Sequence, residues 1–274
     1  MSPLGRYWEI AHVFITTIHS IVLENLSHRF SKPNILDIKL GTKLFDDEAS
    51  EEKKARMIQK AKDTTSLETG MRLTGFQVSS VQRLALGGIF LLNSSVLQFQ
   101  VYDTSTGQAV NAPKSYGRSI KPSGLPDGIA KFFPIHSERS TQGLPKEQLL
   151  SVIEVIREIV AMIRDAFAQL EIRMAGGSFL IIYEGDLERA KQGIALLEEE
   201  GVGEEEEEEE DDDDDDDEDE DEDDTKPGPP CLVKLIDFAH TKVVPGEGPD
   251  EGVLLGMDTT LKLLDGRMAQ IKGT

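Results

Sequence analysis

The sequence predicts a fold that mixes buried strands with amphipathic helices. Apolar runs of strand length occur at residues 33–40, 177–185 and 231–236. Across residues 146–174, apolar side chains recur at every third or fourth position, which is the period of one helix face. With 274 residues, the chain can bury one large core or two small ones.

The first strand, residues 33–40, carries two charges, Asp37 and Lys39, that point to the same face because they are two positions apart. Burying both is costly unless each meets a partner or a charged ligand. One interpretation is an internal ion pair at a sheet edge, and the other is a functional site. The functional interpretation gains support from the strand at 231–236, which also ends in a carboxylate, Asp237.

A helix is expected from residue 51 to about residue 62, with Ser50 as its N-cap. Lys53, Arg56 and Lys60 then lie on one helix face, since they are spaced three and four residues apart. A solvated surface helix and an anion-binding face are both compatible with this pattern.

The remaining elements follow from the same signals. A strand is expected at 73–78, a short helix at 122–133, a helix at 186–197 capped by Asp186, and a final helix opened by Asp250. The core positions expected in the helix at 146–174 are Leu149, Ile153, Ile156, Val160, Ile163, Phe167 and Leu170. Those expected in the final helix are Leu254, Leu255, Leu261, Leu263 and Leu264.

Most of the net charge comes from one segment. The formal net charge is −22, and residues 204–224 are an unbroken run of 21 acidic residues, so the rest of the chain carries about −1. The folded part is therefore nearly neutral, and its net charge does not argue against binding of a polyanion. Such a run has no apolar surface to bury, so we expect residues 201–230 to form a disordered loop. This loop is either a solvating spacer or a segment that binds basic nuclear proteins or transcription factors.

The single cysteine, Cys231, excludes an internal disulfide and suits a reducing compartment. It begins an apolar strand, and we expect it in the core. The apolar run at 7–23 is interrupted by Glu9, His12 and His19, which argues against a membrane span or a secretory signal. We therefore expect a soluble protein of the nucleus and cytoplasm.

Three motifs, in this order, resemble the inositol polyphosphate kinase family. They are Pro-x-x-x-Asp-x-Lys-x-Gly at 33–41, Ser-x-Leu followed by Tyr-Glu-Gly at 178–185, and Ile-Asp-Phe-Ala-His at 236–240. Among the members, the fungal inositol polyphosphate multikinases of the arginine-regulation type look most similar. The resemblance covers about residues 21–77 and 101–268.

The resemblance implies an α+β fold related to the two-lobe architecture of protein kinases. Residues 21–274 are expected to form the kinase domain, mainly its larger lobe. Residues 1–20 do not look like the family's smaller N-terminal lobe, which we expect to be largely missing or misassigned. The triplet Phe76-Gln77-Val78 recurs as Phe99-Gln100-Val101, and residues 78–100 separate Gln77 from Val101. We expect them to be an insertion, either a translated intron or a genuine hairpin extension.

The resemblance also implies an activity. It indicates an ATP- and Mg²⁺-dependent kinase that converts inositol trisphosphate to tetrakis- and pentakisphosphate. One alternative is an inositol hexakisphosphate kinase that makes pyrophosphates. Another is a truncated, inactive kinase that acts as a transcription-linked scaffold through the acidic loop. A monomer without direct nucleic-acid binding is expected.

Family resemblance assigns the nucleotide and metal roles. Glu24 and Leu26 resemble the hinge that holds adenine, and Asp37 takes the place of the ribose ligand. Asp237 is the expected Mg²⁺ ligand, with Ser178 in support, because a hard cation prefers carboxylate oxygen.

The same resemblance assigns the catalytic and substrate roles. Lys39 is expected to contact the reacting phosphate or the inositol hydroxyl, and His240 is expected beside the inositol. Lys39, Asp237 and His240 form the expected catalytic set. The inositol phosphate wall is expected to comprise Lys53, Arg56, Lys60 and Gln77.

Overall fold

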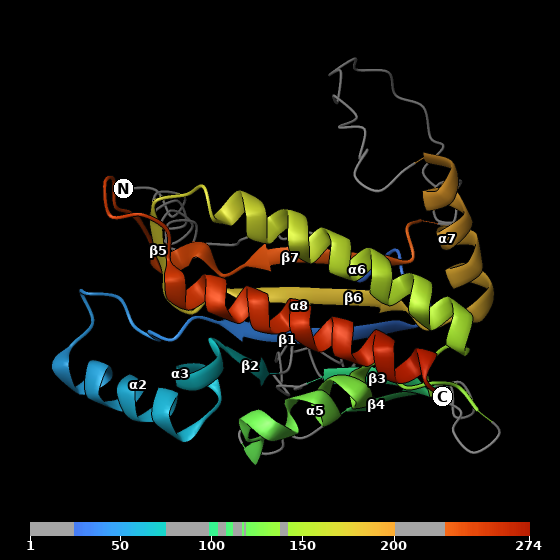
Figure 1. Cartoon of the computed structure of the whole chain (residues 1–274), viewed down its shortest axis with the longest axis horizontal. Helices are drawn as coiled ribbons and strands as arrows, with labels where there is room; N and C mark the ends of the chain where they lie inside the picture. The colour runs from blue at the N-terminus through green and yellow to red at the C-terminus, as the bar shows by residue number, and fades with distance from the viewer. Residues whose placement is uncertain are drawn as a thin grey trace, which may run out of the picture.

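The computed structural model describes residues 25–74, 99–103, 108–111, 117, 119–137, 142–200 and 228–274. The atypical N-terminus, residues 78–98 of the predicted insertion and the acidic run therefore lie outside the described residues, whereas Phe99 and Gln100, its last two residues, belong to a strand of the sheet. A mixed sheet and helix architecture confirms the predicted α+β fold: an antiparallel sheet is covered on one face by two long helices (Figure 1). Within the described ranges, no helix is long and apolar enough to cross a membrane.

The central sheet has the strand order β4-β3-β1-β6-β7, and β2 pairs with β1 beside β3. Its pairings are all antiparallel in the described part. The strands are β1 (Pro33–Leu40), β2 (Met71–Thr74), β3 (Phe99–Asp103), β4 (Gln108–Asn111), β6 (Ser178–Glu184) and β7 (Cys231–Ile236). β1 has partners on both sides, so Asp37 and Lys39 sit in the interior of the sheet and not at an edge.

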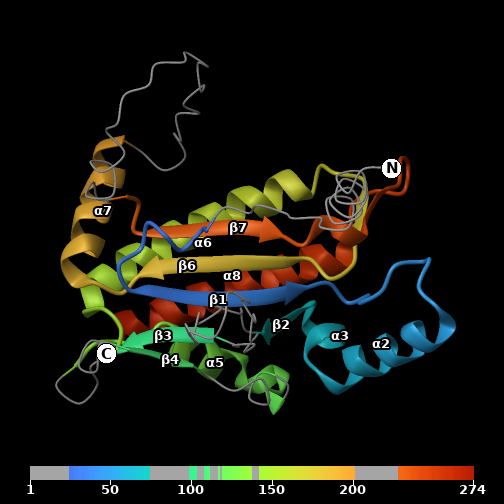
Figure 2. The same cartoon turned by 180° about the vertical axis from the view of Figure 1, so that it is seen from behind.

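One face of the sheet is apolar and packs against helices. Leu36 and Ile38 of β1 lie opposite Ile181 and Phe179 of β6, and all four are fully buried. Helices α6 (Lys146–Phe167) and α8 (Glu251–Lys272) run side by side over this face (Figure 1). Seen from behind, β1, β6 and β7 lie in front of these two helices, so their other face points away from them (Figure 2).

The smaller helices surround the sheet. They are α2 (Glu51–Asp63), α3 (Ser66–Thr69), α5 (Leu125–Phe132) after the 3₁₀ turn η1 (Pro122–Gly124), and α7 (Leu187–Glu200). The predicted caps are confirmed. Ser50 accepts a hydrogen bond from the backbone of Lys53, and Asp250 accepts from Gly252 and Val253. Asp186 likewise accepts from Glu188 and Arg189 at the start of α7.

The helix predicted at 146–174 is wrong at its end. It stops at Phe167, and Ile172–Met174 form strand β5, which pairs with β8 (Thr241–Val243). Leu170, expected in the core, is 47% exposed because it lies in the turn between helix and strand. The partner of β5 lies far downstream, so helical periodicity contains no signal for it.

A smaller difference concerns a predicted core position of α8. Leu255 of α8 is 40% exposed, whereas Gly256 beside it is buried. Gly256 and Gly70 meet backbone to backbone: a Cβ on Gly256 would lie 2.1 Å from the Gly70 carbonyl oxygen. This close approach brings the start of β2 into contact with α8.

The strand predicted at 73–78 begins at Met71, and its residues after Thr74 lie outside the described part.

Cys231 is in the core, as predicted. It is 3% exposed, and burial raises the pKa of its thiol to about 12. Tyr183 anchors the same core by donating its hydroxyl to the Phe132 carbonyl oxygen at 2.8 Å and by packing against Phe132 and Phe133.

Candidate active site

The sheet face that points away from α6 and α8 brings together four predicted site residues. Asp37 and Lys39 come from β1, Ser178 from β6, and Asp237 follows β7. Register explains their proximity: Lys39 is the cross-strand partner of Ser178, and Ser178 is the partner of Ile236, the residue before Asp237. We call Asp37, Lys39, Ser178 and Asp237 the sheet-borne cluster.

Lys39 is the centre of this cluster. Its ammonium group forms an ion pair with Asp237 Oδ2, lies 3.7 Å from Asp37 Oδ2 and donates to the Gly176 carbonyl oxygen at 3.4 Å. Its side chain remains 25% exposed. One cation thus sits between two carboxylates and still reaches solvent, which is the position needed to meet an anionic ligand.

Asp37 is the buried carboxylate. Its side chain is 8% exposed, and Thr74 Oγ1 donates to Asp37 Oδ1 at 3.0 Å. Burial raises the pKa of this carboxyl above 3.8, while the charge of Lys39 and hydrogen bonds from Thr74 and Ser178 oppose the rise. Asp37 is therefore costly to keep ionised, and perturbed groups of this kind concentrate at functional sites.

Asp237 has an unusual backbone. It is the only non-glycine residue among the described ones with a positive φ, 70°, and it directly precedes the 3₁₀ turn η3 (Phe238–His240). The left-handed conformation costs an L-residue about 1–2 kcal/mol, although Asp tolerates it better than most. In this conformation the Asp237 carboxylate contacts Lys39 and lies 3.4 Å from the Ser178 hydroxyl, and the Asp237 side chain is half exposed.

His240 lies in the same turn as Asp237, but its imidazole reaches a different part of the chain. His240 Nδ1 lies 2.6 Å from Asp46 Oδ2, in the loop between β1 and α2. The His240 carbonyl oxygen accepts a hydrogen bond from the Ala175 N–H at 3.1 Å. Asp46 is not among the predicted site residues.

Lys53, Arg56 and Lys60 lie on α2, and we call them the basic face of α2. Arg56 is exposed, and the other two are partly buried. α2 and α3 lie beyond the carboxyl end of β1, the end of the sheet at which β7 also finishes (Figure 2). The structure therefore places these cations at the same end as Asp237, but on a separate element. Gln77, predicted to complete the wall, lies outside the described residues.

Arg72 is a buried cation that sequence reasoning missed. It is the β2 partner of Lys39, which puts both side chains on the same sheet face, and it is 6% exposed. Its guanidinium donates to Ser66 Oγ at 3.5 Å. An arginine inside a short apolar strand was the available signal, because buried guanidinium groups need partners.

Beyond Asp37 the same sheet face becomes apolar. Leu26, predicted for the adenine hinge, and Ile236 each pack against a small buried apolar cluster on this face. The buried members of the cluster are Phe30, Ile35, Leu180, Ile182 and Leu232. Glu24, the other predicted hinge residue, lies outside the described residues.

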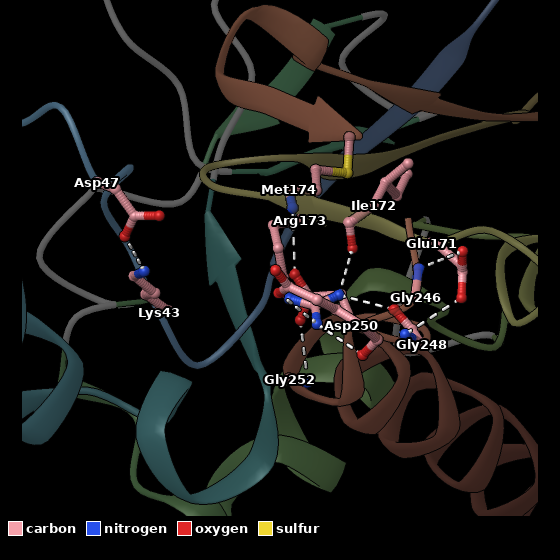
Figure 3. A network of polar contacts seen from close by, with 11 residues as sticks. Lys43, Asp47, Glu171, Ile172, Arg173, Met174, Gly246, Gly248, Asp250 and Gly252 are labelled. Carbon is pink, nitrogen blue, oxygen red and sulfur yellow. Dashed lines mark hydrogen bonds and ion pairs between the residues drawn. The ribbon is translucent and has the colours of Figure 1, made fainter. Parts of the chain in front are cut away.

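Hydrogen bonds anchor the strand pair that carries η3 to the start of α8 (Figure 3). Asp250 caps α8 and also accepts from the Met174 N–H at 3.1 Å. Arg173 donates to the Gly248 carbonyl oxygen at 2.8 Å, and Glu171 accepts from the Gly246 N–H at 2.8 Å. These hydrogen bonds thus fix the strands next to the turn that contains Asp237 and His240.

The oxygen donors of the cluster suit a hard cation. In the described part of the chain, no group of three or more His, Cys, Asp or Glu side chains converges as a complete metal site. Mg²⁺ does not require one, since it is usually bound by one or two carboxylates together with water and substrate phosphates. Asp237, with the Ser178 hydroxyl and Asp37 nearby, fits that requirement.

Two known proteins are similar to this chain in sequence. Inositol polyphosphate multikinase from Saccharomyces cerevisiae is 36% identical over 253 residues, which are 89% of this chain and 67% of that protein. Inositol hexakisphosphate kinase 2 from Mus musculus is 30% identical over 257 residues, 89% of this chain and 48% of that protein. The chain thus spans about half the length of this hexakisphosphate kinase.

Solved structures share the fold. Inositol phosphate multikinase Ipk2 from S. cerevisiae, in complex with ADP and Mn²⁺, superposes with a TM-score of 0.59 at 29% identity, over 89% of this chain and 82% of that chain. A further inositol phosphate multikinase structure, at 19% identity, has a TM-score of 0.56 over 94% and 91% of the two chains, and supports the fold alone. The profile of the inositol polyphosphate kinase family matches residues 20–265. The chain belongs to the inositol polyphosphate kinase family.

Proposed function

We propose that this chain is an ATP- and Mg²⁺-dependent kinase that converts inositol trisphosphate to tetrakis- and pentakisphosphate. The observation that carries the proposal is Lys39, held between Asp37 and Asp237 on one sheet face. Phosphoryl transfer asks a protein mainly to position two anionic substrates and to neutralise charge, and this arrangement can do both. The relative solved with ADP and Mn²⁺ supports the choice of cofactors.

The nucleotide would lie along the face that carries Asp37. The Asp37 carboxylate would accept hydrogen bonds from the ribose hydroxyls. Leu26 and Ile236, the two partly exposed side chains of the apolar cluster, would offer a surface for the flat adenine ring. The Asp37 carboxylate, followed by apolar side chains on the same face, matches the order of ribose and base in ATP.

The transfer step would take place at Lys39. The inositol hydroxyl oxygen would attack the γ-phosphorus and release its proton to water, while the bond from that phosphorus to the bridging oxygen breaks and ADP leaves. The Lys39 ammonium offsets the negative charge on the transferred group. Asp237 and Ser178 would hold Mg²⁺, which neutralises phosphate oxygens when it is bound.

The inositol phosphate would lie at the end of the sheet near α2. Several phosphates require several cations that converge from one side, and arginine adds bidentate hydrogen bonding. The basic face of α2 supplies three cations with helical spacing. His240, in the turn after Asp237, would contact the same substrate.

The test is phosphorylation of inositol trisphosphate by the purified chain with ATP and Mg²⁺. We expect turnover, and a loss of at least about 100-fold in the Asp237→Ala variant, because a charged group at the reacting centre is removed. Asp265→Asn is the matched control: it changes a half-exposed carboxylate of α8 that pairs with Arg157. Turnover of inositol hexakisphosphate in place of the trisphosphate would favour the pyrophosphate-forming alternative. Absence of turnover and of ATP binding would contradict the proposal.

The multikinase assignment is favoured over the hexakisphosphate kinase because the yeast multikinase is more similar, at 36% against 30% identity. Residence in the nucleus and cytoplasm, and binding of basic nuclear proteins by the acidic run, stay predictions. They are supported by 21 successive acidic residues, which attract cationic partners.

A further inference from the structure

We propose that Asp46 is a positioning residue that holds the His240 imidazole and links the basic face of α2 to the turn containing Asp237. The proposal rests on the proposed kinase function for its consequence, but its geometry stands on one side-chain contact between distant segments. Asp46 Oδ2 lies 2.6 Å from His240 Nδ1, with Asp46 26% and His240 54% exposed.

The contact determines which imidazole nitrogen faces the substrate. A carboxylate only accepts hydrogen bonds, so His240 Nδ1 must carry the proton that Asp46 binds. Nε2 lies on the far side of the ring and is left to meet a ligand. Asp46 itself is a poor partner for a phosphate, because both are anions. Its effect on an anionic substrate is therefore indirect, through the imidazole and through the position of α2.

On the other side, Asp46 belongs to the loop that sets the position of α2. The Asp46 carbonyl oxygen accepts from the Ala49 N–H at 3.3 Å, one residue before Ser50, the N-cap of α2. In the same loop, Phe45 lines a small hollow together with Met57 and Ala61 of α2. The loop from Gly41 to Ser50 thus ends in the N-cap of α2, and its Phe45 borders the same hollow as α2.

α2 has few other ties to the sheet. It packs mainly against α3 and stands apart from the layer of α6 and α8 (Figure 1). η3, in contrast, is held by the Ala175–His240 backbone hydrogen bond and by the pairing of β5 with β8. The Asp46–His240 contact therefore joins a loosely packed element to a firmly held one, and it aligns the basic face of α2 with the sheet-borne cluster.

The first measurement is the protonation pattern of the imidazole. The full-length chain is labelled with ¹⁵N-histidine, and the His240 signals are identified among the five histidines by their loss in His240→Gln. In the wild type we expect the neutral ring to carry its proton on Nδ1. In Asp46→Ala we expect the proton to move mainly to Nε2. Asp46→Asn keeps an oxygen acceptor and should restore the wild-type pattern.

The second measurement is binding of inositol trisphosphate and, separately, of ATP by calorimetry. Asp46→Ala should weaken inositol trisphosphate binding by about tenfold, the size expected when one charge-assisted contact is lost. ATP binding should be unchanged. Asp47→Ala is the matched control, because Asp47 is the adjacent acidic residue and its carboxylate pairs with Lys43 at 2.5 Å.

An unchanged His240 spectrum in Asp46→Ala would overturn the proposal, as would equal inositol trisphosphate affinities of Asp46→Ala and Asp47→Ala. If the wild type binds no inositol trisphosphate, the proposed kinase function fails, and the His240 spectrum still decides whether Asp46 positions the imidazole. If Asp46→Ala does not fold, Asp46→Ser, which has a shorter side chain and no carboxylate, replaces it in both measurements.

Discussion

The sheet-borne cluster and the basic face of α2 are held in place by different kinds of contact. In the cluster, Lys39 and Ser178 are register partners in the interior of the sheet, and Asp237 follows the next strand. The basic face belongs to a helix that packs mainly against α3 and reaches the site through a loop. The cluster should therefore control turnover, and the basic face should control substrate affinity with little effect on folding.

The largest effect is expected at the centre of the cluster. Lys39→Met keeps the length of the side chain but removes the cation between Asp37 and Asp237. We expect kcat to fall by about 1,000-fold, as when a charge that stabilises the transition state is deleted. Steady-state kinetics with inositol trisphosphate measures it. Lys43→Met, which removes an exposed lysine paired with Asp47, should leave kcat unchanged. A loss below tenfold in Lys39→Met would contradict the central role of Lys39.

A second substitution tests whether the sheet that carries the cluster depends on close packing against α8. Gly256→Ala would force a methyl group onto the Gly70 backbone, so we expect the free energy of unfolding to fall by about 1–3 kcal/mol. Gly266→Ala in the same helix meets nothing within 4 Å and should raise stability by up to about 1 kcal/mol. Denaturant unfolding measures both. Equal effects would show that the Gly70–Gly256 contact is not a constraint.

The basic face should behave differently. Arg56→Ala removes an exposed cation, and we expect the KM for inositol trisphosphate to rise by about tenfold while the free energy of unfolding changes by less than about 0.5 kcal/mol. Lys54→Ala is the control, because Lys54 pairs with Glu51 and lies outside the basic face. A similar rise in KM in both variants would reduce the role of the basic face to net charge.

The smallest expected effect is a pH dependence of stability with opposite signs at two carboxylates. The pKa of Asp37 is raised by burial, so its ionisation above 3.8 destabilises the fold, and the stability advantage of Asp37→Asn should grow as the pH rises. The pKa of Asp186 is lowered, chiefly by its hydrogen bond from Lys32. Its stabilising effect is present above pH 3.8 and is lost as the pH falls through the lowered pKa.

Asp186→Asn should therefore be less stable than the wild type at neutral pH, by about 1 kcal/mol or less for a partly exposed ion pair. Thermal unfolding across the pH range tests both variants. A parallel pH dependence for Asp37→Asn and Asp186→Asn would contradict the assigned burial of Asp37.

Local signals predicted much of this molecule. The apolar runs gave the strands at 33–40 and 231–236, and the caps Ser50 and Asp250 marked helix starts that the structure confirms. The shared face of Asp37 and Lys39 follows from the two-residue repeat of a strand. Each of these features depends only on residues a few positions apart in the chain, so a single sequence is enough to predict it.

Contacts between distant segments decided the rest. β5 forms where a helix was expected, because its pairing partner is β8. Asp237 adopts a left-handed backbone, and Arg72 lies beside Lys39 through the pairing of β1 with β2. His240 meets Asp46 across the fold. The sequence by itself determined which residues carry charge and where most of the strands and helices begin. The tertiary structure decided which charges meet, because the cost of burying a charge depends on partners far away in the chain.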